Sequence, residues 1–190
     1  GVYSSFMLHA KRAAKRFGKC AENLVVTGHN QEFPAHEPRA KRSLALIYAV
    51  NPFGADHMSH EHDFGYRPTA GQENKDNLGM IGCLEPQHAR SLGPAKVRFA
   101  LQTEYIYSAL DCLGTCMFVW GPTWQLYHLD QLVECVRAVT GWKTSLWELM
   151  TVGERRLNLL RAYNAREGMT SADDQLPARM FTPAVGGATD

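Results

Sequence analysis

The chain is organised around one stretch, Leu110-Asp111-Cys112-Leu113-Gly114-Thr115-Cys116-Met117-Phe118, which ends a long apolar helix. An acid, a glycine and a cysteine stand close together here. Placing a carboxylate and a thiol in the interior costs desolvation free energy that packing does not require, so we expect them to serve a ligand or cofactor. The alternative is a plain helix C-terminus, because glycine readily adopts the left-handed backbone that caps a helix.

Helices are expected on both sides of this stretch. Gly93-Pro94 starts a helix over residues 95–110, since proline suits the first helical turn. Its later part is apolar nearly all round, which is typical of a central helix. Apolar stripes, turn residues and a capping box formed by Ser145 and Glu148 predict three further helices, at residues 3–17, from Thr123 to Gly141 and from Ser145 to Gly168.

The remaining segments carry weaker patterns. Residues 43–50 are almost continuously apolar, which fits either a buried helix or a buried strand. Residues 24–27 fit a short strand, and the glycine- and proline-rich residues 63–93 fit a long loop. The pattern therefore predicts an all-α fold, an irregular helical domain with a long polar loop over residues 1–182, followed by a flexible tail at 183–190.

Composition excludes several classes of protein. The 190 residues are 45% hydrophobic and 21% charged, which is ordinary for a globular domain. With 20 basic and 19 acidic residues the net charge is +1, so we expect no nucleic-acid or anionic-membrane partner. No apolar run reaches the roughly 18 residues of a membrane span, and the five cysteines lack a CxxC or disulfide-scaffold spacing. These features favour a soluble, cytoplasmic protein.

A second reactive segment is Asn51–Asp63, which holds three histidines and three acids between residues 56 and 63. In a helix His57 and His60 would share a face whereas His62 would not, so the match to zinc-site spacings is weak. One histidine that donates or accepts a proton is the simpler interpretation, with His60 and His62 exposed to solvent. Two alternatives stay open: a mononuclear metallohydrolase that uses His57, His60 and His62, and a non-catalytic helical interaction module.

Five segments in order along nearly the whole chain resemble the aldehyde:ferredoxin oxidoreductase family. Members of this family are tungsten or molybdenum bis-pterin enzymes that oxidise aldehydes to carboxylic acids. The segments are EFPAHEPR at 32–39, SLALIYA with NPFGADH at 43–57, DCLGTC at 111–116, GERRLN at 153–158 and DDQLPAR at 173–179.

The resemblance implies roles for particular residues. His57 takes the place of the active-site histidine near the metal, Asp111 and Gly114 would hold a pterin, and Cys116 would be the last ligand of a 4Fe-4S cluster. A thiolate suits iron, and glycine lets the backbone approach a flat heterocycle. An aldehyde substrate, ferredoxin or a similar electron acceptor, and further N-terminal domains are also implied. The chain is thus expected to be a C-terminal domain fragment that is inactive alone.

Overall fold

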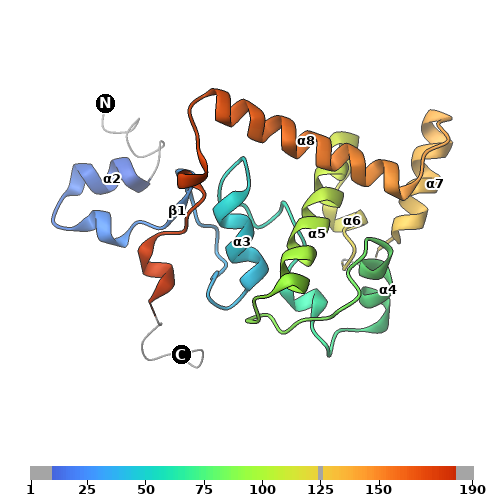
Figure 1. The fold of residues 1–190 in the computed structure, drawn as a ribbon, viewed down its shortest axis with the longest axis horizontal. Helices are drawn as coiled ribbons and strands as arrows, with labels where there is room; N and C mark the ends of the chain where they lie inside the picture. Colours follow the sequence, from blue (N-terminus) through green and yellow to red (C-terminus); the bar gives the residue numbers. More distant parts are fainter. Residues whose placement is uncertain (1–9, 124–125, 183–190) are drawn as a thin grey trace.

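The computed structural model describes residues 10–123 and 126–182 and confirms the helical fold class. The α-helices of this part of the chain are α2 (Ala10–Phe17), α3 (Arg42–Val50), α4 (Gln72–Met80), α5 (Pro94–Leu113), α6 (Met117–Trp120), α7 (Leu129–Thr140) and α8 (Leu146–Arg166). Figure 1 shows α8 extending over α3 and α5, with α7 at one end of the molecule and α2 at the other. Among the described residues, no helix is both long and apolar enough to cross a membrane.

Short elements link these helices. Two-residue strands β1 (Thr27–Gly28) and β2 (Gln31–Glu32) pair antiparallel, and 3₁₀ turns lie at η1 (Ala21–Leu24), η2 (Asp63–Tyr66), η3 (Ser171–Asp173) and η4 (Ala178–Phe181). Between the strands, His29 and Asn30 both have positive φ, 46° and 68°, as a tight hairpin turn of the I′ kind requires. The prediction of a strand at residues 24–27 is therefore wrong except at Thr27.

Helix α5 is central, as its apolar pattern predicts. Its buried side chains join the main core, in which Tyr66 stacks on Phe99 with ring centroids 4.5 Å apart. The helix begins with Pro94 and ends at Gly114, which has φ 65° in the left-handed region. Most of the core side chains come from α4, α5, α7 and α8: Leu78, Phe99, Ile106, Tyr107, Leu110, Leu132, Val133 and Leu149.

Helix α8 lies directly against α5, and one glycine makes this close approach possible. A Cβ atom at Gly153 would stand 1.9 Å from the carbonyl oxygen of Tyr105. Beside it, the Ser108 hydroxyl donates a hydrogen bond to the Gly153 carbonyl over 3.0 Å. The α8 N-terminus carries the predicted capping box, in which Ser145 Oγ accepts from the Glu148 amide.

Helix α3 settles the ambiguity at residues 43–50, where both a helix and a strand were possible. Its buried Leu44 and Tyr48 form a second, smaller core with Ala55. The hairpin packs against it so closely that a Cβ at Gly28 would stand 2.2 Å from the Tyr48 carbonyl oxygen. The segment 51–62, which follows α3, is held to the hairpin by a hydrogen bond from the Ala55 amide to the Gly28 carbonyl and to α5 by a hydrogen bond from the Tyr107 hydroxyl to Glu61.

The long loop predicted at residues 63–93 is partly wrong, because it contains η2 and α4. Helix α4 buries only Asn77 and Leu78, so its sequence shows no apolar stripe. The helix predicted from Tyr3 is described only from Ala10 onward. Residues 1–9 and the predicted tail 183–190 lie outside the described residues.

Candidate functional site

The end of α5 and the turn that follows it carry three of the residues singled out in the sequence. Asp111, Cys112 and Cys116 are exposed, so the expectation that the acid and the thiol enter the interior is wrong for this chain. Leu110 is buried, whereas Asp111 and Cys112 lie on the exposed side of the last turn of α5, and Cys116 lies beyond the end of the helix. Gly114 caps the helix in the left-handed conformation. The alternative interpretation of this stretch, a plain helix C-terminus, is therefore correct for the backbone.

The surface around Gly114 is open. A Cβ built on Gly114 would meet no atom within 4 Å. Asp111 Oδ2 lies 3.1 Å from Arg156 Nη1, which also approaches Ser108 Oγ at 3.2 Å. Backbone, carboxylate and guanidinium groups therefore meet on an accessible face, and such a face fits one side of a flat, polar heterocycle.

Cys116 is the predicted cluster ligand. It is exposed at the start of the short helix α6. A 4Fe-4S cluster takes four thiolates, whereas the described residues contain no group of three or more His, Cys, Asp or Glu side chains placed to hold a metal ion. Cys116 fits a cluster only as one ligand, with the others supplied by other segments.

His57 lies in a cluster of histidines around one lysine. Its ring centroid is 4.8 Å from that of His36 and 6.0 Å from that of His62. Lys41 Nζ lies 3.1 Å from His36 Nδ1 and 2.9 Å from His62 Nδ1. His62 Nε2 is 3.0 Å from the His57 carbonyl oxygen, so the His62 side chain contacts the backbone of His57 within the same segment.

The expectation that His60 and His62 are solvated is wrong. His60 is fully buried, and its ring stacks on the half-buried ring of His62 at a centroid distance of 6.0 Å. Neither ring nitrogen of His60 has a hydrogen-bond partner in the described chain, and neither does Nδ1 of His57. In the described part of the chain, the three histidines form no group placed to hold a metal ion.

Burial and the lysine charge act together on this cluster. They lower the pKa of His62 to about 4, with burial as the larger cause, and they lower the pKa of His36 in the same way. Burial also lowers the pKa of Lys41, although the Asp63 carboxylate opposes this effect. The rings of His36 and His62 are therefore neutral near pH 7.

A buried ion pair between Asp63 and Lys96 lies beside the histidine cluster. Asp63 Oδ1 lies 2.5 Å from Lys96 Nζ, and both side chains are fully buried. The same carboxylate accepts hydrogen bonds from the Ser43 hydroxyl and from the amides of Ser43 and Leu44. Because those amides belong to the first turn of α3, Asp63 ties this helix end to the start of α5.

Glu61 makes a second buried connection. Its carboxylate accepts hydrogen bonds from the His62 amide, the Tyr107 hydroxyl and the Thr123 amide at 2.9 to 3.1 Å. Burial nevertheless raises the pKa of Glu61. The carboxylates of Glu61 and Asp63 therefore hold the irregular segment Asn51–Asp63 in place. The rings of its histidines lie close to one another.

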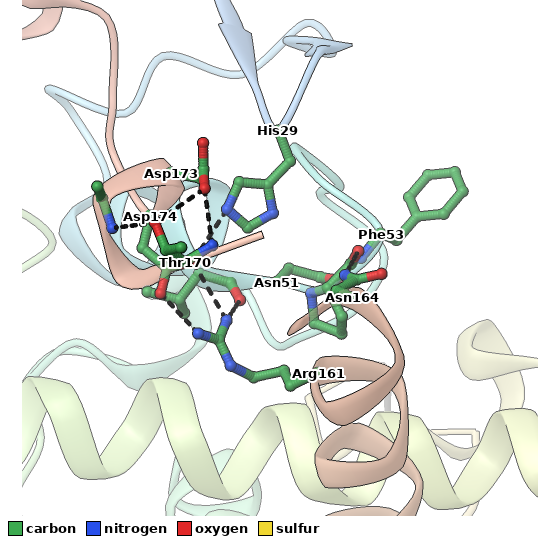
Figure 2. A network of polar contacts seen from close by, with 11 residues as sticks. His29, Asn51, Phe53, Arg161, Asn164, Thr170, Asp173 and Asp174 are labelled. Carbon is green, nitrogen blue, oxygen red and sulfur yellow. Dashed lines mark hydrogen bonds and ion pairs between the residues drawn. The ribbon is translucent and has the colours of Figure 1, made fainter. Parts of the chain in front are cut away.

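The last of the five segments reaches the same region from the opposite end of the chain. Figure 2 shows Asp174 between His29 of the hairpin and Arg161 of α8, at 3.0 Å and 2.6 Å. Arg161 also donates to the Val50 carbonyl, and Asn164 donates to the Pro52 carbonyl. Segments 43–57 and 173–179, far apart in sequence, are thus joined through α8.

A cavity of about 190 Å³ lies between the 51–59 segment, α5 and α8. Its walls include Asp56 and Ser59 on one side and Asp111 with Arg156 on the other. The cavity therefore brings Asp111 next to residues that flank His57 in the sequence. Glu104 also lines it, is only 6% exposed, and has no partner for Oε1 among the described residues.

Glu104 makes a testable contribution to the pH dependence of stability. Burial raises its pKa from 4.5 to about 7, against the opposing charge of Arg161. Between these values the folded state binds a proton that the unfolded state has released, so the free energy of unfolding falls as pH rises from about 4.5 to about 7. The difference between the two pKa values corresponds to a loss of unfolding free energy on the order of 3 kcal/mol.

Urea unfolding at pH 5 and pH 8 measures this effect. Between pH 5 and pH 8 the free energy of unfolding should fall less in the Glu104→Gln variant than in the wild type. The expected difference between the two falls is on the order of 3 kcal/mol. A matched control is Glu134→Gln, since Glu134 is exposed on α7. An equal fall in the wild type and Glu104→Gln would contradict the assignment.

Sequence reasoning missed Lys41 and Glu104 as parts of the site, and it considered His60 only as a zinc ligand or as a solvent-exposed side chain. Lys41 stands between a proline-containing segment and α3 with nothing locally distinctive. Glu104 lies in the later, mostly apolar part of α5, and an acid among such residues is the one signal that the sequence offers.

Comparison with known proteins confirms the resemblance drawn from the five segments. A family model described as "Aldehyde ferredoxin oxidoreductase, domains 2 & 3" matches residues 9–190. Proteins named tungsten-containing aldehyde ferredoxin oxidoreductase from Pyrococcus abyssi and Pyrococcus furiosus are each 26% identical over 171 residues. The alignment covers 90% of this chain in both cases and 25% of each relative.

A third relative with the same name, from Thermococcus kodakarensis, is 26% identical over 151 residues, 79% of this chain. The chain spans about a quarter of the length of the curated relatives it matches. Its similarity is therefore to one part of longer proteins.

Proposed function

Because the chain belongs to the aldehyde ferredoxin oxidoreductase family, we propose that it is part of an enzyme that oxidises aldehydes to carboxylic acids. The electrons leave through an iron–sulfur cluster to ferredoxin or a similar acceptor. The chain supplies one wall of the active site, further domains supply the rest, and the chain alone is inactive. Its length, about a quarter of that of its relatives, supports this proposal.

His57 is the residue proposed for proton transfer or for a hydrogen bond to the aldehyde oxygen. The observation that carries this role is its buried Nδ1, which has no hydrogen-bond partner in the described chain. A polar atom that is buried without a partner costs free energy, and a substrate oxygen would satisfy it. The neighbouring rings of His36 and His62 stay neutral near pH 7, so they add no competing charge.

Asp111, Gly114 and Cys116 are proposed to face the cofactors. Asp111 and the open backbone at Gly114 would hold a pterin, and Cys116 would give one thiolate to a 4Fe-4S cluster. When bound, the tungsten or molybdenum pterin would supply the two-electron redox chemistry, and this chain's residues would orient and shield the substrate. Arg156 keeps the Asp111 carboxylate in place through its ion pair.

His57→Gln in the intact enzyme tests the catalytic role. We expect aldehyde-dependent reduction of the electron acceptor to fall by about 10²- to 10⁴-fold, the usual contribution of a proton-transferring side chain. The control is His88→Gln, because His88 is exposed on the loop before α5. Activity within a factor of two of wild type in His57→Gln, with tungsten or molybdenum and iron retained, would refute the role.

A further inference from the structure

We propose that Lys41 is a positioning residue, which fixes the proton positions of His36 and His62 and, through His62, holds the backbone of His57. The functional part of this inference rests on the proposed role of His57. The hydrogen-bond part rests on the geometry of the cluster alone.

Lys41 is a donor at the centre of the cluster. An ammonium group has three N–H donors and accepts no hydrogen bond. Lys41 is 7% exposed, and its Nζ lies 4.9 Å from the centroid of the Phe64 ring. Burial lowers the pKa of Lys41, and the Asp63 carboxylate opposes this effect. A ring face and a nearby carboxylate are the surroundings of a cation.

The two histidines beside Lys41 must therefore accept. His36 Nδ1 and His62 Nδ1 face Nζ at 3.1 and 2.9 Å, so neither nitrogen carries a proton in this arrangement. A neutral imidazole with an accepting Nδ1 has its proton on Nε2. Lys41 thus selects one tautomer for both rings.

The contact of the second ring nitrogen of His62, Nε2, supports the same tautomer independently. Its Nε2 lies 3.0 Å from the His57 carbonyl oxygen, which can only accept. Nε2 must therefore donate, as the Lys41 contact requires. The chain Lys41–His62–His57 is a directed series of hydrogen bonds that ends on the backbone of the proposed catalytic residue.

Burial is the larger cause that keeps His36 and His62 neutral, and the lysine charge adds to it. Among the residues that the structure describes, the titratable groups around Lys41 and His62 include His36, His57, His60, Glu61 and Asp63, from the preceding loop, the 51–62 segment and η2. Protonation of His62 at Nδ1 would place two donors against each other at 2.9 Å. Removing the lysine charge is therefore expected to raise the pKa of His62 from about 4 toward its ordinary 6.5.

Nitrogen-15 NMR of the histidine rings in the full chain tests the inference without substrate or cofactor. In the wild type we expect His62 to be the Nε2–H tautomer and to stay neutral at pH 5. In Lys41→Met we expect His36 to become a mixture of tautomers, whereas His62 keeps its proton on Nε2 because this nitrogen still donates to the His57 carbonyl. We expect the titration midpoint of His62 to rise above its wild-type value. Lys143→Met, an exposed lysine change beside α8, should leave both unchanged.

The wild-type spectrum alone can overturn the inference, even where Lys41→Met does not fold. A proton on His62 Nδ1, or a charged His62 at neutral pH, would exclude Lys41 as its donor. In the intact enzyme, Lys41→Met should lower kcat by about 10- to 100-fold through misplacement of His57, with partial recovery in Lys41→Arg. If His57→Gln keeps full activity, the proposed function fails, whereas the tautomer result still stands.

Discussion

Replacing Lys96 with methionine is expected to lower the free energy of unfolding by about 3–5 kcal/mol. The change leaves the Asp63 carboxylate buried without its cation, because both side chains of the pair are fully buried. The hydrogen bonds that Asp63 accepts from Ser43 and Leu44 remain, but they cannot replace a full positive charge. The start of α3 is therefore the region expected to loosen first.

Chemical unfolding followed by circular dichroism measures this loss. Lys75→Met is the matched control, since Lys75 makes a hydrogen bond to the Pro68 carbonyl near the surface, and it should change stability by about 0.5 kcal/mol or less. A double variant, Lys96→Met with Asp63→Asn, should recover part of the loss because it removes the unpaired charge. A loss below about 1 kcal/mol in Lys96→Met would show that the pair is unimportant.

Replacing Gly153 with alanine is expected to cost about 3 kcal/mol or more. The new Cβ would lie 1.9 Å from the Tyr105 carbonyl oxygen and 3.0 Å from the Ala109 amide nitrogen. Both contacts are with backbone, so α8 must move away from α5. Overpacking of this kind usually costs 1–3 kcal/mol, and here it also strains the hydrogen bond from Ser108 to the Gly153 carbonyl.

Gly79→Ala in α4 is the control for this substitution. Its Cβ would meet only the Leu84 side chain at 3.7 Å, which is ordinary contact. Alanine is about 0.5–1 kcal/mol better than glycine inside a helix, so this variant should be neutral or slightly more stable. Equal stability of Gly153→Ala and Gly79→Ala in thermal unfolding would contradict the close packing of α5 and α8.

Local signals in the sequence were enough to predict the ends of α5 and α7 and the start of α8, whereas α7 begins at Leu129 and not at the predicted Thr123. Ser145 with Glu148 marks the start of α8, and Gly114 and Gly141 mark the ends of α5 and α7. Each of these signals acts within one turn of its own helix. Helix α4 has no such local signal. Tertiary contacts stabilise it instead, such as the hydrogen bond between Asn77 and His128.

The candidate site was less predictable, because its contacts cross long distances in the sequence. The lysine that organises the histidines lies 21 residues before His62. The exposure of Asp111 and Cys116 was also beyond local patterns: an apolar helix predicts burial along its length, but not where it emerges at the surface. The residue types were thus found from sequence, whereas their environments required the fold.

The contacts of Asp174 have a consequence for the order of folding. Asp174 bonds to His29 across 145 residues of chain, and Arg39 bonds to the Thr182 carbonyl across 143. Contacts that close such long loops carry a large entropic cost and tend to form late. We therefore expect α5 and α8 to assemble first and the hairpin to dock last. Hydrogen exchange should accordingly be fastest where the two ends of the described chain meet.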